Sequence, residues 1–266
     1  MIIYSMVAGG VSVGGLFLAG IVPGVFLGLA LMLMSYIIAV KRNYPAGEHV
    51  SWKDALSATK DAALGLFTAV IVVGGVVTGL YTATESAAIA AIYAFLVSFF
   101  VYRHVPLCHM RIILMKSLRT LAIVMALIAT SSAFGWMLAY LKVPALATQT
   151  LLSISDNKYV ILLVLNALLL FLGCIMDMAP LILITTPILL PVATKIGVDP
   201  IHFGIIMMLN LSIGLLTPPV GSTLFVGCAI GNISIEKLSR TMIPFYVTMI
   251  TVLMLITYVP QLVMFI

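Results

Sequence analysis

The chain has 266 residues, of which 63% are hydrophobic and only 8% are charged, and its mean hydropathy is +1.27. This composition excludes a soluble globular domain and is typical of a polytopic helical protein that is embedded in the lipid bilayer. The formal net charge is +5, but the basic residues lie at the ends of apolar segments, so they indicate membrane topology and argue against a nucleic-acid partner.

The first part of the chain predicts two membrane spans separated by an amphipathic helix. The apolar segment 16–40 is long enough to cross a bilayer. From Trp52 onward, apolar and charged residues take opposite faces at helical spacing, which is typical of a helix at the membrane surface or against a partner. A helix restart is predicted at Thr84, where the Glu85 carboxylate is favourable near a helix N-terminus, and it begins a span at 85–102.

The middle of the chain predicts one more span between two loops. The loop at 103–119 is expected to be basic, the span runs over 121–140, and a more polar loop follows at 142–158. Two apolar arms then follow within 159–193, and each is short for a full crossing. We interpret them as a re-entrant hairpin with its tip near Asp177.

The stretch from Asn210 to Asn232 is apolar enough for a bilayer, yet it cannot form one continuous helix. Pro218 and Pro219 remove two backbone donors and force the residue before each of them out of the α region. In lipid an unsatisfied carbonyl costs several kcal/mol, so an unwound stretch persists only where it is buried in protein or lines a cavity. A broken helix at 201–230 is therefore expected, as in secondary transporters, and a simple proline kink is the alternative.

The two ends of the chain show a weak repeat that implies an inverted architecture. Ser12 aligns with Ser234 and, after a gap of one residue, Pro23 aligns with Pro244, so each copy has a loop before a helix with an early proline. If the basic loops are cytoplasmic, only three of the 13 Lys and Arg residues lie outside. The first span then runs inward and the last span runs outward, as in inverted transporter repeats.

This alignment gives the predicted domain organisation. Segment 1–40 is the end of a first inverted repeat whose hairpin is missing, 41–119 holds the amphipathic arm helix and scaffold spans, and 120–266 is the second inverted repeat. The counterpart of 217–222 would precede Met1. We therefore expect the chain to be the C-terminal part of a longer protein, or to begin at a mis-assigned start.

A sodium site is the predicted chemistry of the hairpin tip and the broken helix. Asp177 is the only ionisable side chain deep within the apolar segments after Lys158, and a carboxylate at the bilayer centre costs about 2.5–3.5 kcal/mol, so a cation partner is expected. Together with Thr217, Pro218 and Gly221 it would form a hard oxygen shell suited to sodium. The alternative is an aspartate that caps the second arm at the membrane surface.

Other polar residues are candidates for lining a substrate cavity, although each alone is more often a helix-packing hydroxyl or amide. They are Thr186, Asn210, Ser222 and Thr223. The histidines share no ligand spacing, the three cysteines have no metal or redox spacing, and no catalytic motif is present in the sequence. No resident metal, cofactor or enzyme activity is therefore predicted.

The sequence resembles the large membrane subunit of tripartite ATP-independent periplasmic (TRAP) transporters of the C4-dicarboxylate and sialic acid type. The motifs that carry the resemblance are dispersed over nearly the whole chain and are specific in combination. They are Leu16–Gly24, Thr82–Ala91 with Tyr93 and Ala94, Met176–Asp177 followed by Thr186–Pro191, Gly197–Gly204, and Asn210–Phe225 with its Leu-Thr-Pro-Pro-Val-Gly core.

The resemblance implies sodium-coupled, elevator-type import of an organic acid in the bacterial inner membrane, with two hairpins and two broken helices in the moving domain. Its implied partners are a periplasmic substrate-binding protein and a small four-helix membrane subunit. It places Asp177 and Thr217–Gly221 at the second sodium site, and Ser222 and Thr223 near the substrate. Ala83 departs from the family pattern, which usually has proline there, and the missing first hairpin would remove the first sodium site.

Two other functions fit the sequence. A stand-alone symporter of sodium and a divalent anion would need no periplasmic protein, and an inactive truncated fragment would show no transport. Uptake by the complete protein, with and without its binding protein, discriminates between these alternatives.

Overall fold

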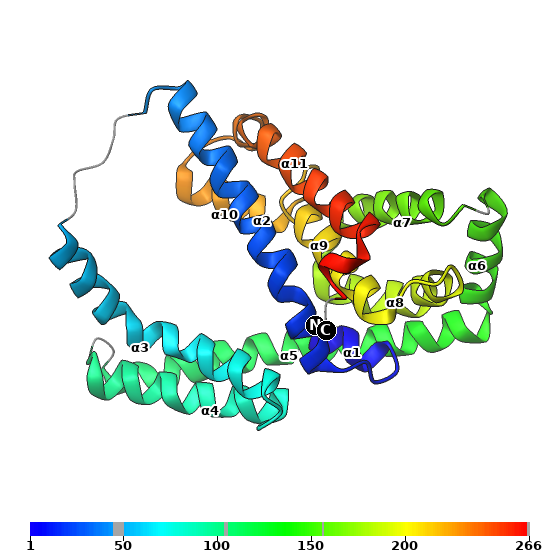
Figure 1. The fold of residues 1–266 in the computed structure, drawn as a ribbon. Helices are drawn as coiled ribbons and strands as arrows, with labels where there is room; N and C mark the ends of the chain where they lie inside the picture. Colours follow the sequence, from blue (N-terminus) through cyan, green and yellow to red (C-terminus); the bar gives the residue numbers. More distant parts are fainter. Residues whose placement is uncertain (45–50, 104–105, 156, 265–266) are drawn as a thin grey trace. The chain divides into compact units, whose positions relative to one another are not determined.

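The computed structural model describes residues 1–44, 51–103, 106–155 and 157–264 (Figure 1). All elements in this part of the chain are helices, and they form two compact units, one of Met1–Lys41 with Ala126–Ile266 and one of Arg42–Met125. In the described residues, five helices are long and apolar enough to cross a membrane, or six if the bent helix α3 (Trp52–Val77) counts as one span. The prediction of an all-α polytopic membrane protein is confirmed.

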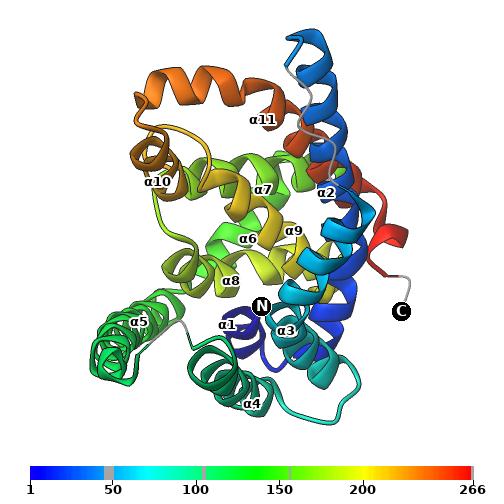
Figure 2. The same cartoon turned by 90° about the vertical axis from the view of Figure 1, so that its left-hand side faces the viewer.

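The larger unit is built around α9 (Pro200–Gly214), which lies in its middle (Figures 1 and 2). α9 packs against four helices, which are α2 (Val13–Lys41), α7 (Lys158–Gly173), α8 (Met178–Lys195) and α11 (Ile235–Tyr258). The unit also contains α1 (Ile2–Val7), α6 (Val143–Ile154), α10 (Ser222–Gly231) and a short 3-10 turn at Pro260–Leu262. This arrangement encloses α9 on several sides.

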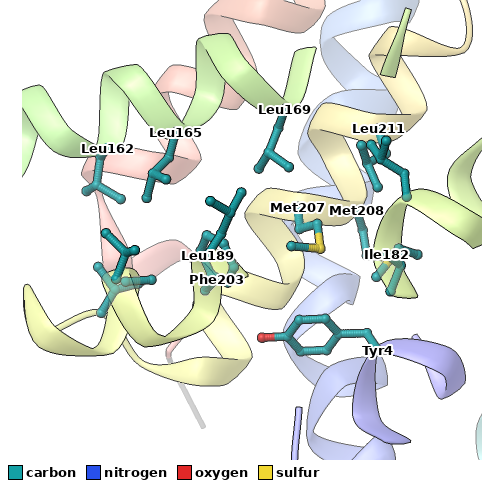
Figure 3. Close-up of a cluster of buried hydrophobic side chains, with 14 of the residues drawn as sticks. Tyr4, Leu162, Leu165, Leu169, Ile182, Leu189, Phe203, Met207, Met208 and Leu211 are labelled. Carbon is teal, nitrogen blue, oxygen red and sulfur yellow. The ribbon is translucent and has the colours of Figure 1, made fainter. Parts of the chain in front are cut away.

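The burial of α9 follows from its sequence, because a helix that is apolar all round must be surrounded by other apolar groups. Phe203 and Met207 are fully buried, and leucines of α7 project toward them (Figure 3). On another side the Tyr4 hydroxyl of α1 donates a hydrogen bond to the Pro200 carbonyl at 2.6 Å. Gly204 makes this contact possible, because a Cβ there would lie 2.6 Å from the Tyr4 ring.

The smaller unit consists of α3, α4 (Ala83–Leu96), a π-helical turn at Val97–Val101, a 3-10 turn at Leu107–His109 and the beginning of α5 (Met110–Tyr140). α3 packs along α4. The Tyr93 ring meets Phe67 edge-on with a centroid distance of 5.6 Å, and its hydroxyl donates to the Leu64 carbonyl at 3.0 Å. These contacts tie α3 and α4 together as a helical pair.

The start of α4 confirms the predicted helix restart, because the helix begins at Ala83, one residue before Thr84. The N-cap is Thr82, and its side chain accepts a hydrogen bond from the backbone N–H of Glu85 while the Glu85 carboxylate accepts from the backbone N–H of Thr82 at 2.8 Å. This is a capping box, which satisfies two backbone donors that the first helical turn leaves free. The carboxylate is thus engaged locally at the beginning of the span.

Two predictions of loops are wrong. The segment 103–119 was expected to be a basic loop, but α5 begins at Met110 and continues to Tyr140. Residues 107–134 include no proline or glycine, and long basic side chains fit on a helix because their aliphatic stems cover apolar surface. Nothing in that segment therefore interrupts the helix.

The second error concerns the polar loop expected at 142–158. It contains α6, whose second residue is Pro144, a position where proline is well tolerated because the first-turn N–H has no helical partner. α6 packs against α8, and burial of one face stabilises it. The sequence of this segment alone does not predict the helix. The amphipathic helix from Trp52 is confirmed as the beginning of α3, which extends farther, to Val77.

Candidate functional site

The helix interruption is present and separates α9 from α10 at residues 215–221. The Pro218–Pro219 peptide bond is cis, and Gly221 at the N-cap of α10 has a φ of 44°. A side chain at Gly221 would be strained by this left-handed conformation, and its Cβ would lie 3.0 Å from the Thr217 carbonyl oxygen. The expectation of a broken helix is confirmed, and the alternative of a simple proline kink within one continuous helix is excluded.

The joint between α7 and α8 packs directly on this interruption. The Cys174 carbonyl accepts hydrogen bonds from the backbone N–H groups of Val220 at 3.2 Å and Gly221 at 3.4 Å. The last residues of α7 and α9 meet backbone to backbone, since a Cβ on Gly214 would lie only 2.6 Å from the carbonyl carbon of Gly173. The α7–α8 joint and the interruption, about forty residues apart in sequence, therefore form one structural element. In an apolar environment unwound backbone must find hydrogen-bond partners within the protein, and here the joint supplies one.

Two backbone oxygens of the interruption are available to a ligand. The carbonyl oxygens of Leu216 and Leu215 already accept hydrogen bonds. The Tyr246 hydroxyl donates to Leu216 at 2.8 Å, and the Thr223 N–H donates to Leu215 at 3.3 Å. Among the described residues, no hydrogen-bond donor engages the carbonyls of Thr217 and Pro218. Unpaired carbonyls of this kind are ligands that sodium and other hard cations prefer.

Asp177 is the N-cap residue of α8 and lies three positions after the Cys174 joint. Its side chain is exposed and makes no capping hydrogen bond. The backbone position is therefore that of the capping alternative, but the carboxylate is not used to cap the helix. Among the described residues no side chain pairs with it, and it lies on the same joint that contacts the interruption.

The other predicted site residues divide into two groups. Thr217, Ser222 and Thr223 lie at the interruption or in the first turn of α10, although the Thr217 hydroxyl donates to the Ile213 carbonyl at 2.7 Å. Thr186 and Asn210 are fully buried in the helical core. Only the first group is brought together with the joint.

The two core residues have partners in neighbouring helices. The Thr186 hydroxyl lies 3.5 Å from the Met207 sulfur. The Asn210 amide nitrogen donates to the Asn166 side-chain oxygen at 2.5 Å and to the Ile206 carbonyl at 2.9 Å. Their contacts are those of helix packing.

Sequence reasoning missed a buried polar chain across three helices. Asn166 of α7 accepts from Asn210 of α9 and donates to the Thr257 hydroxyl of α11 at 3.2 Å. The available signal was an asparagine in the middle of the apolar arm 159–173. A buried amide in such an environment needs a partner, so its position in the sequence points to a contact between helices.

The fold and this site define a class, that of multi-pass helical membrane proteins with an interrupted helix packed against a helical hairpin. Residues 1–262 match the family described as tripartite ATP-independent periplasmic transporter, DctM component. The chain belongs to this family. Its family is one of transporter permeases and not of enzymes.

Three relatives cover 98% of the chain. They are an uncharacterized protein, YgiK, from Salmonella typhimurium with 44% identity, the sialic acid TRAP transporter large permease protein SiaM from Vibrio cholerae with 40%, and the C4-dicarboxylate TRAP transporter large permease protein DctM from Pseudomonas aeruginosa with 38%. The chain spans 60% of the length of YgiK and 61% of that of each of the other two.

Proposed function

We propose that the protein is the large permease subunit of a sodium-coupled TRAP transporter that imports a small organic acid. The observation that carries the proposal is the packing of the α7–α8 joint, with its free Asp177 carboxylate, on the unwound Thr217–Gly221 backbone. One carboxylate and the unpaired carbonyls of Thr217 and Pro218 supply oxygen ligands for a monovalent cation. In this assignment Asp177, Thr217, Pro218 and Gly221 bind sodium.

The substrate is assigned to the side of α10. Ser222 and Thr223 are exposed in the first helical turn, where their hydroxyl groups and the helix dipole favour a carboxylate. In this proposal Thr186 and Asn210 hold α7, α8 and α9 in place through their contacts with Met207 and Asn166. The names of SiaM and DctM refer to sialic acid and C4-dicarboxylates, which are all organic acids, and we extend that chemical class to this protein.

Electrical energy makes sodium coupling workable. Each positive charge that moves inward gains about 2.3 kcal/mol per 100 mV, so two sodium ions gain about 4.6 kcal/mol. Moving one anionic charge in the same direction costs about 2.3 kcal/mol. The remainder corresponds to about 1.7 decades of substrate accumulation before any sodium gradient acts. At least two sodium ions per monoanion are therefore favoured over one.

The transport cycle that we propose is of the elevator type, in which the interruption and the α7–α8 hairpin move together. A periplasmic binding protein delivers the substrate, and a small four-helix membrane subunit braces the immobile helices in the bacterial inner membrane. We also propose that residues 1–40 are the end of a first repeat that is inverted in the membrane relative to the second repeat. Backbone hydrogen bonds between Cys174 and the pair Val220 and Gly221 support it, because they connect the two moving parts.

The test is uptake into proteoliposomes that contain the complete protein and the small membrane subunit, with the purified binding protein outside. Radiolabelled sialic acid and C4-dicarboxylates serve as substrates, and potassium replaces sodium in the control. Uptake that requires both sodium and the binding protein supports the proposal. Uptake that is equal in potassium would overturn sodium coupling, and sodium-dependent uptake without the binding protein would favour the stand-alone symporter.

A further inference from the structure

The first turns of α5 form a basic surface that the proposed transport site does not use. Arg111, Lys116 and Arg119 are all exposed there. With 3.6 residues per helical turn, their positions fall within an arc of about 140°, so they share one face of the helix. An open hollow of about 800 Å³ follows this face and is lined by the three basic residues with Ile112, Met115 and Leu118.

The charge of this surface is not compensated within its own part of the chain. The sequence from Ser86 to Ser155 contains no aspartate or glutamate. The preceding acidic residue, Glu85, is engaged by the backbone and side chain of Thr82 at 2.8 Å in the capping box. Three exposed cations with no nearby carboxylate along the sequence favour an external anion.

The length of α5 places this surface at the level of the lipid headgroups. Leu107–Tyr140 form a helical segment of 34 residues, whereas about 20 residues cross the hydrocarbon layer. The segment 121–140 has no charged residue, so it fits the hydrocarbon. At 1.5 Å per residue, the remaining residues from Leu107 to Thr120 extend about 21 Å beyond the hydrocarbon. The headgroup region is about 5–7 Å deep, so it holds Arg119 and Lys116, while Arg111 lies beyond it on the aqueous side.

The chemistry of the hollow fits a phospholipid better than a fully water-soluble anion. Arginine and lysine bind phosphate through charge-assisted hydrogen bonds, and guanidinium groups do so with two parallel bonds. Leu118 lies between Lys116 and Arg119, and the uncharged segment from Leu121 continues into the hydrocarbon. An acyl chain covers this apolar helix surface beside the two cations, and free phosphate does not.

We propose that the first three turns of α5 bind an anionic phospholipid. The phosphate group contacts Lys116 and Arg119, Arg111 adds electrostatic attraction from the aqueous side, and the acyl chain lies along the apolar segment that follows Thr120. The bound lipid anchors the beginning of α5 at the membrane interface. This inference depends on the membrane-spanning character of α5 and not on sodium coupling or on the substrate.

The experiment measures lipid retention by native mass spectrometry of the complete purified protein in detergent. The protein is titrated with phosphatidylglycerol and, separately, with phosphatidylcholine. The test variant combines Arg111→Gln, Lys116→Gln and Arg119→Gln, because glutamine keeps a high helix propensity without charge. The matched control removes the same number of charges from the same compact unit through Arg42→Gln, Lys53→Gln and Lys60→Gln.

We expect the wild type and the control to retain phosphatidylglycerol in preference to phosphatidylcholine. The test variant should lose this preference by about a hundredfold, since each of the three basic residues near an anionic surface contributes roughly a fivefold factor. If the triple variant is not monodisperse, the single variants Lys116→Gln and Lys53→Gln are compared instead. Lys116→Gln should then lose the preference for phosphatidylglycerol by roughly fivefold relative to Lys53→Gln.

Three results would overturn the inference. The first is an equal loss in the test variant and the control, which would mean that total charge alone matters. The second is retention of phosphatidylglycerol by the test variant at the wild-type level. The third is displacement of the lipid by inorganic phosphate at the same concentration, which would identify a site for the free anion.

Discussion

The close contact of Gly173 with Gly214 makes Gly214→Ala a direct test of the coupling between the α7–α8 joint and the helix interruption. An added Cβ would lie 2.6 Å from the carbonyl carbon of Gly173, 2.7 Å from its Cα and 3.0 Å from its oxygen. Ordinary contacts between carbon atoms are about 3.5–4.0 Å. The obstacle is backbone, which no rotamer change can remove, so the ends of α7 and α9 must separate by about 1 Å.

The cost of this separation has two parts. Overpacking in a filled core costs about 1–3 kcal/mol. The movement also stretches the hydrogen bonds of Val220 and Gly221 to the Cys174 carbonyl, which are already 3.2 and 3.4 Å long, and their loss costs about 1–3 kcal/mol together. The gain in helix propensity from glycine to alanine offsets about 0.5–1 kcal/mol. The net destabilisation is therefore about 1–5 kcal/mol.

Gly28→Ala is the matched control, because Gly28 lies within α2 and a Cβ there has no neighbour within 4 Å. Apparent melting temperatures in detergent, measured on the complete protein, should fall by about 5–10 °C for Gly214→Ala and stay equal or rise slightly for Gly28→Ala. Sodium-dependent uptake should fall only in Gly214→Ala. Equal melting temperatures and equal uptake of the two variants would refute the reasoning about this contact.

Three further substitutions test separate parts of the site. Asp177→Asn should raise the sodium concentration for half-maximal uptake about tenfold to a hundredfold, because a charge-assisted contact is worth about 1.5–3 kcal/mol, and unchanged sodium activation would remove this carboxylate from the site. Gly221→Ala should lower the free energy of unfolding by about 1–2 kcal/mol through its left-handed backbone and the nearby Thr217 oxygen, and thermal melting checks this. Asn166→Ala, which takes a partner from buried Asn210, should cost about 1–3 kcal/mol by the same measurement, and wild-type stability would contradict it.

The sequence predicted the interruption and the helical arms because their causes are local. Pro218 and Pro219 have no backbone N–H, so a continuous helix through them is impossible whatever surrounds it. The arms 159–173 and 178–193 correspond closely to α7 and α8, since the first apolar run ends at Gly173 and the second begins after Asp177. The membrane-protein class follows from composition alone.

The first part of α5 and the whole of α6 were missed because charge and polarity were treated as marks of loops. The helix α5 extends beyond the hydrocarbon layer and contains Arg111, Lys116 and Arg119 in that part, where charged side chains have no desolvation cost. α6 depends on a tertiary contact with α8, and such packing supplies most of the stability of a short helix. No local pattern reports that contact.

The partners of the candidate site residues also could not be predicted from the sequence. Asn210 and Ser222 belong to one motif in the sequence, yet Asn210 is fully buried against Asn166 and Ser222 is exposed in α10. Their environments differ because the interruption turns the chain between them. Spacing along an uninterrupted helix does not carry across such a break.

The rigidity of the interruption has a consequence for the proposed cation site. The unwound backbone is held by hydrogen bonds to Cys174, by the Tyr246 hydroxyl on Leu216 and by the contact between Gly173 and Gly214. Breaking these bonds in an apolar environment leaves polar groups without partners, which is costly. The carbonyls of Thr217 and Pro218 are therefore already ordered before a cation arrives. A preorganised site loses little conformational entropy on binding, so a weakly held ion such as sodium can be bound by few protein ligands, and the joint must follow the interruption whenever either moves.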